Sequence, residues 1–272
     1  MKKNISYRSA ELLNVLNQEE KQFFTLQEAM KILVLSEPDA VRKLLADMTK
    51  RGLILRIKDG LYNIIPYERN SEEYFPNWHL AAEAIMQPED FYIGFYSALD
   101  IYGLITQPSL KEQIVTLKQI TPKYHIVKKV KFEFITLNKK RFFGYEKSWI
   151  DDFNKIYCSD LEKTIVDCLY KPSYANGITE IIKAIYKSEK KINSEKMLMY
   201  LEKFDAQVVY KRLGFLLEHL DILTPLTKEI KSKLSNSYSL LDPALPKDGK
   251  HYSDWRLVDN VGIETALKSI GT

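Results

Sequence analysis

The stretch SEPDAVRKLLADMTKRGLILRIKDGLYNII, residues 36–65, contains the signals for one helix and one β-hairpin. Ser36 predicts the N-cap of the helix, and Pro38 lies in its first turn, where the missing N–H of proline is harmless. Gly52 stands just beyond the last turn, where glycine commonly ends a helix. Two short β-rich runs follow, separated by an Asp-Gly pair, which is a strong hairpin signal. We therefore expect a helix followed by a hairpin.

The expected helix has one apolar and one polar face. Its apolar residues recur at the i, i+3, i+4, i+7 spacing that places side chains on one face, and they are Val41, Leu44, Leu45 and Met48. At 100° per residue the opposite face collects Asp39, Lys43, Ala46 and Lys50, with Arg42 at its margin. The first face is predicted to enter the core, and the second to be exposed and partly basic.

Two shorter helices are predicted before this one. Leu12, Leu13 and Leu16 form an apolar stripe. Thr25, with Glu28 three residues later, forms a capping box that opens a second helix. Three helices followed by a hairpin is the order of a winged helix-turn-helix. We place this domain at residues 1–66 and a polar connector at residues 67–77.

A helix-turn-helix binds DNA by laying its second helix in the major groove. Here that helix is the one predicted from Glu37 to Arg51. The residues expected to contact phosphates or bases are Ser36, Arg42, Lys43, Lys50, Arg51, Arg56 and Lys58. Residues 1–66 contain 11 Lys+Arg and 8 Asp+Glu, so the basic bias is modest. Two alternatives stay open: these charges are simply solvated, or the module docks a protein.

The rest of the chain, residues 78–272, is predicted to form a larger mixed α+β domain with a mainly helical C-terminal half. Apolar or alternating runs predict strands at 113–117 and 130–137, and a further one at 141–147. Ser159 followed by Glu162 predicts a second capping box. The tail from Tyr238 to Asn260 is expected to be irregular. The whole chain is thus assigned to the α+β class.

A second concentration of positive charge lies in residues 111–155, with 11 Lys+Arg against 5 Asp+Glu. A solvated face, a nucleic acid and an acidic protein partner are all compatible with it. The residues that we assign to a partner surface are Lys128, Lys129, Lys131, Lys139, Lys140 and Arg141.

Patterns typical of catalysis or metal binding are missing from the sequence. The four histidines are scattered, and the phosphate-binding and serine-hydrolase motifs GxxxxGK[ST], GxGxxG and GxSxG do not occur. The nearest approach to a nuclease-like cluster is Asp160, Glu162, Lys163 and Asp167, where helix capping and the helix dipole already explain the first two. We therefore expect no enzymatic activity, no metal and no cofactor.

Cellular location follows from two further absences in the sequence. No run approaches the roughly 18 apolar residues of a membrane span, and no apolar region follows the N-terminal lysines as in a signal peptide. Cys158 and Cys168 are ten positions apart and are expected to be reduced, buried thiols. We expect a cytoplasmic protein without a membrane partner.

Several segments together resemble one family, the antitoxin and transcriptional regulator of bacterial AbiE abortive-infection systems. The segments are RGLILRIKDGLYNI (51–64), FYSALDIYGL (95–104), SDLEKTIVDCLYKP (159–172), KRLGFLLE (211–218), LDP (241–243) and WRL (255–257). Each one is short, but their order and spacing extend over nearly the whole chain.

This resemblance implies a component of a type IV toxin–antitoxin system used in phage defence. In that family the N-terminal domain represses its own operon, and the C-terminal part counters a nucleotidyltransferase-like toxin. Operator DNA and the toxin are then the expected partners, the latter without a necessary direct complex. Two other classes stay open: a nuclease-like enzyme that uses the region from Asp160 to Asp167, and a stand-alone transcription factor that senses a ligand.

Overall fold

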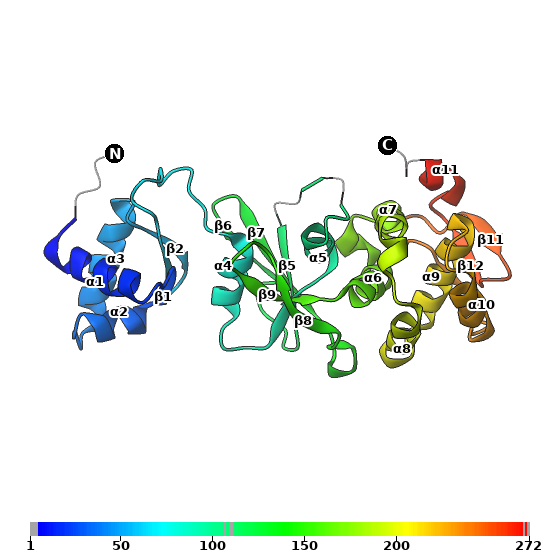
Figure 1. Ribbon diagram of the computed structural model, residues 1–272, viewed down its shortest axis with the longest axis horizontal. Coiled ribbons are helices and arrows are strands. Elements are labelled where there is room, and N and C mark those ends of the chain that lie inside the picture. The colour runs from blue at the N-terminus through cyan, green and yellow to red at the C-terminus, as the bar shows by residue number, and fades with distance from the viewer. Residues whose placement is uncertain (1–4, 106, 109–110, 269, 271–272) are drawn as a thin grey trace. The chain divides into compact units, whose positions relative to one another are not determined.

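The computed structural model describes residues 5–105, 107–108, 111–268 and 270. They divide into two compact units (Figure 1). The first unit contains the described residues up to Asp90 together with 126–130, and the second contains Phe91–His125 and the described residues from Lys131 onward. Both units combine helices with strands. The predicted α+β class is therefore confirmed.

The first unit contains a small sheet and the helices that precede and follow it. Its elements are α1 (Tyr7–Gln18), β1 (Phe23–Thr25), α2 (Leu26–Ile32), α3 (Pro38–Lys50), β2 (Ile54–Lys58), β3 (Leu61–Ile64) and α4 (Trp78–Met86). Strands β1 and β2 both pair antiparallel with β3. The hairpin predicted after Gly52 is therefore present.

The core of this unit is formed by the apolar faces of α1, α2 and α3 against the sheet. Of the predicted stripe on α3, Val41, Leu45 and Met48 are buried and Leu44 is half-buried. Full burial of an aliphatic side chain contributes about 1.5–3 kcal/mol. Burial of this stripe therefore stabilises the packing of α3 in the core of the unit.

The two helix starts predicted in this unit differ in outcome. The capping box of α2 is confirmed: Glu28 N donates to Thr25 Oγ1 at 3.2 Å, and Thr25 N donates to Glu28 Oε2 at 2.7 Å. The Ser36 cap of α3 is wrong, because the N-cap is Glu37, which makes no side-chain capping bond. Pro38 is the reason, since the residue before a proline is kept out of the helical conformation and therefore becomes the cap.

A six-stranded sheet forms the first half of the second unit, except that residues 126–130, where β6 ends and β7 begins, belong to the first unit. Its strands are β4 (Phe91–Ile93), β5 (Lys111–Thr116), β6 (Tyr124–Val127), β7 (Val130–Thr136), β8 (Tyr145–Trp149) and β9 (Lys155–Ser159), in the order β6-β7-β5-β4-β9-β8. Central β4 pairs antiparallel with β5 and parallel with β9. The strand predicted at 141–147 starts later than expected, because Lys139–Arg141 form a 3-10 turn, η1.

Helices cover this sheet and continue beyond it (Figure 1). They are α5 (Phe95–Ile101), α6 (Leu161–Tyr170), α7 (Ile178–Ser188), α8 (Ser194–Phe204), α9 (Gln207–Leu220), α10 (Thr224–Ser232) and α11 (Ile263–Lys268), with 3-10 turns η2 (Pro172–Ala175) and η3 (Glu189–Lys191). One apolar core extends from Tyr92 in β4 to Ala266 in α11. The predicted helical C-terminal half is therefore present.

The tail from Tyr238 to Asn260 is more regular than predicted. It forms a second small sheet from β10 (Ser239–Leu240), β11 (Lys250–Tyr252) and β12 (Leu257–Asp259). Trp255, only 1% exposed, packs against Gly214 of α9, where an added Cβ would lie 2.1 Å from its ring. Local composition missed this sheet because its strands are two or three residues long and depend on that long-range packing.

The capping box predicted at the start of α6 is also wrong. Asp160 is the N-cap and accepts a hydrogen bond from Lys163 N at 3.0 Å. Ser159 is still part of β9, and its hydroxyl bonds Thr164 Oγ1 at 2.7 Å. Glu162 turns instead toward the start of α8, where its carboxylate accepts a hydrogen bond from Asn193 N.

Within the described ranges, no helix combines the length and the apolar character that crossing a lipid bilayer requires.

Candidate nucleic-acid interface

Helix α3 presents a cationic arc to solvent. Arg42, Lys43 and Lys50 are all exposed, and the 100° helical spacing places them within about 100° of one another. Arg42 pairs with Asp39 at 3.0 Å, but both side chains are largely exposed, so this ion pair is weak. The three cations can therefore reach an anionic partner without unpacking the core.

The turn that leads into α3 is held by its own backbone. Val34 N donates to Lys31 O at 3.3 Å and Leu35 N donates to Met30 O at 3.1 Å, the two bonds of a Schellman motif. Val34 adopts a φ of 49°, a conformation normally left to glycine, and its side chain is 89% exposed. This compact turn sets the direction of α3 relative to α2.

Three predicted DNA-contacting residues near the hairpin are engaged within the first unit. Arg51 pairs with Asp47 at 2.5 Å, and Arg56 pairs with Asp59 at 2.8 Å. Lys58 Nζ donates to the carbonyl oxygen of Ile85 in α4 at 2.7 Å, and burial lowers the pKa of this lysine. Contact between Lys58 and a phosphate would require that bond to break.

The predicted contact set is therefore divided. The structure gathers Arg42, Lys43 and Lys50 on one helix face, and Ser36 is exposed just ahead of that helix. Arg51, Arg56 and Lys58 are instead bonded to other residues of the first unit. The partner of Lys58, Ile85, is the most distant of these in the sequence.

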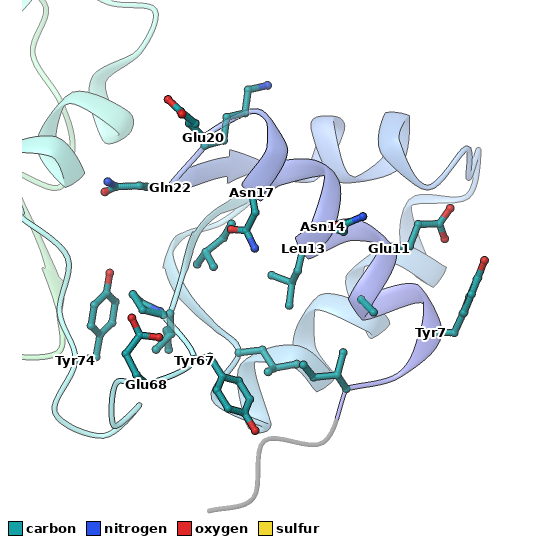
Figure 2. Close-up of a pocket in the computed structure, with 17 residues that line it drawn as sticks. Tyr7, Glu11, Leu13, Asn14, Asn17, Glu20, Gln22, Tyr67, Glu68 and Tyr74 are labelled. Atoms are coloured by element: carbon teal, nitrogen blue, oxygen red, sulfur yellow. The ribbon is translucent and has the colours of Figure 1, made fainter.

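A groove of about 1080 Å³ opens on the first unit and was not anticipated from the sequence (Figure 2). Residues of α1 line one side, and the segment after β3 lines the other. The labelled lining residues in Figure 2 include three tyrosines and three glutamates, Tyr7, Tyr67, Tyr74, Glu11, Glu20 and Glu68. Lys21 also lines it, and pairs with Glu19 and Glu28, each at 3.0 Å. This acidic groove does not suit a phosphate.

The predicted partner surface also separates into parts. Lys128 belongs to the first unit, where its Nζ donates to the carbonyl oxygens of Ser71 and Tyr74, both at 2.7 Å. Burial lowers the pKa of Lys128. Lys129, next to it, is exposed. Lys131 belongs to the second unit and pairs with Glu133 at 3.4 Å.

The three remaining members of that predicted surface lie in η1. Lys139 is exposed, and Lys140 pairs with Asp205 at 2.5 Å. Arg141 Nε donates to Phe204 O at 3.2 Å, and its guanidinium lies 4.4 Å from the centre of the Tyr170 ring. Arg141 thus joins the C-terminal ends of α6 and α8, so part of its role is structural.

The cluster that most resembled a catalytic set is enclosed in the second unit. Lys163 and Asp167 form an ion pair with 0% side-chain exposure. Tyr92 OH donates to Asp167 Oδ2 at 3.0 Å and accepts a hydrogen bond from Lys163 Nζ at 2.9 Å. Burial raises the pKa of Asp167 and lowers that of Lys163, so each group depends on the other to remain charged.

The two other acidic residues of the cluster are also bonded within the chain. Asp160 Oδ2 accepts a hydrogen bond from Tyr200 OH at 2.6 Å, and Lys196 bridges Asp160 and Glu162 at 3.2 and 3.1 Å. Among the described residues, no group of three or more His, Cys, Asp or Glu side chains is placed to hold a metal ion. The cluster therefore joins α6 to α8 and to the sheet.

The two cysteines are buried free thiols, as predicted. Burial raises the pKa of both Cys158 and Cys168, which disfavours the reactive thiolate.

The protein is of the α+β class and has two units, the first of which contains helices α1–α3 and the β2–β3 hairpin. No protein-family model and no curated protein sequence matches the chain. Among solved structures, it is similar to the crystal structure of the RV2827C protein from Mycobacterium tuberculosis, with a TM-score of 0.75. That match covers 99% of this chain and 96% of the other at 13% identity. The two proteins therefore share a fold.

Proposed function

We propose that the protein is a cytoplasmic DNA-binding regulator and that residues 1–66, within its first unit, form a winged helix-turn-helix that represses its own operon. The observation that carries this proposal is the exposed cationic arc of Arg42, Lys43 and Lys50 on α3, the second helix of a helix-turn-helix. The compact turn at Val34 and the β2–β3 hairpin support it, because they leave that face of α3 uncovered.

The proposed binding mode places α3 in the major groove. Lysine and arginine on that helix neutralise phosphates and release counterions, so affinity falls with salt at a log–log slope of about −0.9 per phosphate contact. A side chain that reaches a base edge adds about 1–3 kcal/mol and confers sequence preference.

The test compares a triple variant, Arg42→Ala with Lys43→Ala and Lys50→Ala, with the unchanged full chain. Binding to promoter DNA of its own operon and to random DNA of equal length is measured across salt concentrations. The triple variant should bind the promoter far more weakly and with a shallower salt slope. A matched control removes three exposed lysines of the second unit, Lys190, Lys191 and Lys247, and should bind normally. Equal binding by both variants would refute the assignment of α3.

For residues 78–272, most of which form the second unit, we propose antitoxin activity against a nucleotidyltransferase-like toxin of a type IV toxin–antitoxin system. The resemblance to the AbiE regulators supports this proposal, as does the size of the unit, which has its own core and exceeds what a dimerisation arm requires. Repression and toxin neutralisation would then be separable.

Separability is tested in cells that express the toxin encoded beside this gene. The α3 triple variant should lose repression but still protect the cells. Charge reversal at Lys139 and Lys140, two exposed lysines of the second unit, should instead reduce protection and leave DNA binding intact. Loss of protection in the α3 variant alone would show that antitoxin activity belongs to the first unit.

A further inference from the structure

Strand β8 forms an exposed edge of the six-stranded sheet (Figure 1). Its neighbour β9 pairs with it antiparallel, and the opposing residues include Lys147 with Tyr157 and Trp149 with Lys155. Trp149 is 59% exposed, although the other two tryptophans are half-buried or buried. An edge strand with an exposed tryptophan is prone to pair with another strand.

The backbone pattern shows which residues face the open edge. Ile150 N donates to Asn154 O at 3.0 Å, and Asp160 N donates to Gly144 O at 2.9 Å. The even-numbered residues of β8 therefore direct their backbone N–H and C=O groups toward β9. Because these directions alternate along a strand, Lys147 and Trp149 direct their N–H and C=O groups outward.

Side chains on this edge alternate between cations and aromatic rings. Lys155 Nζ lies 4.3 Å from the centre of the Trp149 ring, and Lys147 Nζ lies 5.4 Å from that of Tyr157. Each is a directly opposed pair, so the sheet already contains two cation–π contacts of this kind. The edge thus offers one lysine and one tryptophan, two positions apart on the same face.

We propose that β8 is a self-association surface, which pairs antiparallel with β8 of a second copy of the chain about a two-fold axis at Ser148. In this register Lys147 of each copy opposes Trp149 of the other, and the outward backbone groups of both residues form hydrogen bonds. The row of side chains across the four strands is then Tyr157, Lys147, Trp149 and Lys155, in which ring and cation alternate.

The charges select this register over its neighbour. An axis at Lys147 would satisfy the same backbone groups, but it would set the two Lys147 ammonium groups directly opposite each other, which is destabilising. Moving the axis to Ser148 replaces that repulsion with two cation–π pairs. A two-fold interface of this kind is closed and uses one patch twice, which makes a dimer rather than a filament.

Sedimentation velocity of the full chain from about 1 to 200 µM tests the proposal, because a small interface has a micromolar Kd. A monomer–dimer equilibrium is expected. In Trp149→Lys, the new lysine of each copy lies opposite Lys147 of the other copy and Lys155 of its own chain. This repulsion should raise the dimer Kd about tenfold or more. The matched control is Tyr186→Lys on α7, which also replaces an exposed aromatic residue and should leave the Kd unchanged. Circular dichroism checks that both variants are folded.

Cysteine cross-linking tests the register separately. Ser148→Cys places two thiols across the axis within the Cα separation that a disulfide spans, and the native cysteines are buried and do not compete. Oxidation with diamide should cross-link Ser148→Cys and spare Glu146→Cys, which changes neither the lysine nor the tryptophan of the edge. A chain that stays monomeric, a dimer that Trp149→Lys does not weaken, or cross-linking of Glu146→Cys in preference to Ser148→Cys would each overturn the proposal.

Discussion

The buried network of Tyr92, Lys163 and Asp167 leads to a prediction that separates a structural role from a catalytic one. We expect the triple variant Tyr92→Phe, Lys163→Met, Asp167→Leu to be about as stable as the unchanged protein. Each substitution keeps the approximate shape of the side chain, and together they remove every charge and hydroxyl of the network. Single substitutions at the same positions should instead be strongly destabilising.

The magnitudes follow from the burial of the network. Lys163→Met leaves the fully buried Asp167 without its cation, and Asp167→Leu leaves Lys163 without its anion, each at a loss of about 3–5 kcal/mol. Tyr92→Phe removes two hydrogen bonds, of 3.0 and 2.9 Å, and should lose about 1–3 kcal/mol. Additive effects would approach the whole stability of an ordinary domain, about 5–15 kcal/mol. The triple variant avoids this sum because no buried polar group remains without a partner.

Urea unfolding at neutral pH, followed by far-UV circular dichroism, measures the four variants. The reasoning predicts a triple variant within about 2 kcal/mol of the unchanged protein, or above it. The reasoning would be refuted if the triple variant lost as much free energy of unfolding as the three single variants together. The ion pair and hydrogen bonds of the network would then contribute more free energy than the burial of its polar groups costs. Incubation with DNA and RNA in magnesium or manganese gives the functional comparison. Turnover abolished in a folded triple variant would favour the nuclease-like alternative.

Gly214→Ala should destabilise the protein by about 1–3 kcal/mol despite the higher helix propensity of alanine, because the new Cβ meets the Trp255 ring; an unchanged thermal midpoint would contradict this. Val34→Gly should stabilise the first unit by about 0.5–1 kcal/mol, because glycine adopts a positive φ without strain, and a loss in urea unfolding would count against the strained turn. Burial raises the pKa of Glu28, but hydrogen bonds from Thr25 and Lys21 outweigh it, so the pKa lies below its ordinary value. The stability contributed by Glu28 should therefore be present above the ordinary pKa of a glutamate and be lost as pH falls through the lowered one, which carboxyl NMR titration and a Glu28→Gln variant would show.

Most features decided by neighbours in the chain could be predicted, although the helix caps assigned to Ser36 and Ser159 were each one residue too early. The capping box of Thr25 and Glu28, the apolar stripe of α3 and the Asp-Gly hairpin each depend on contacts within about four residues, where backbone geometry leaves few choices. The cationic arc on α3 belongs to this group, because helical spacing alone places those side chains together. The residues of α3 on which the proposed function depends could therefore be predicted from the sequence.

Features that depend on distant residues could not be predicted in the same way. From the sequence, Lys58 in the hairpin is expected to be free to contact DNA. In the structure its ammonium group donates a hydrogen bond to the carbonyl oxygen of Ile85 in α4. Asp167 and Lys163 resembled half of an active site, whereas Tyr92, more than 70 residues earlier, completes a buried network around them. Spacing along a helix reports which side chains share a face. Whether a face meets water, another helix or a buried charge is set by the packing of elements far apart in the chain, because desolvation and ion pairing depend on the whole surrounding volume.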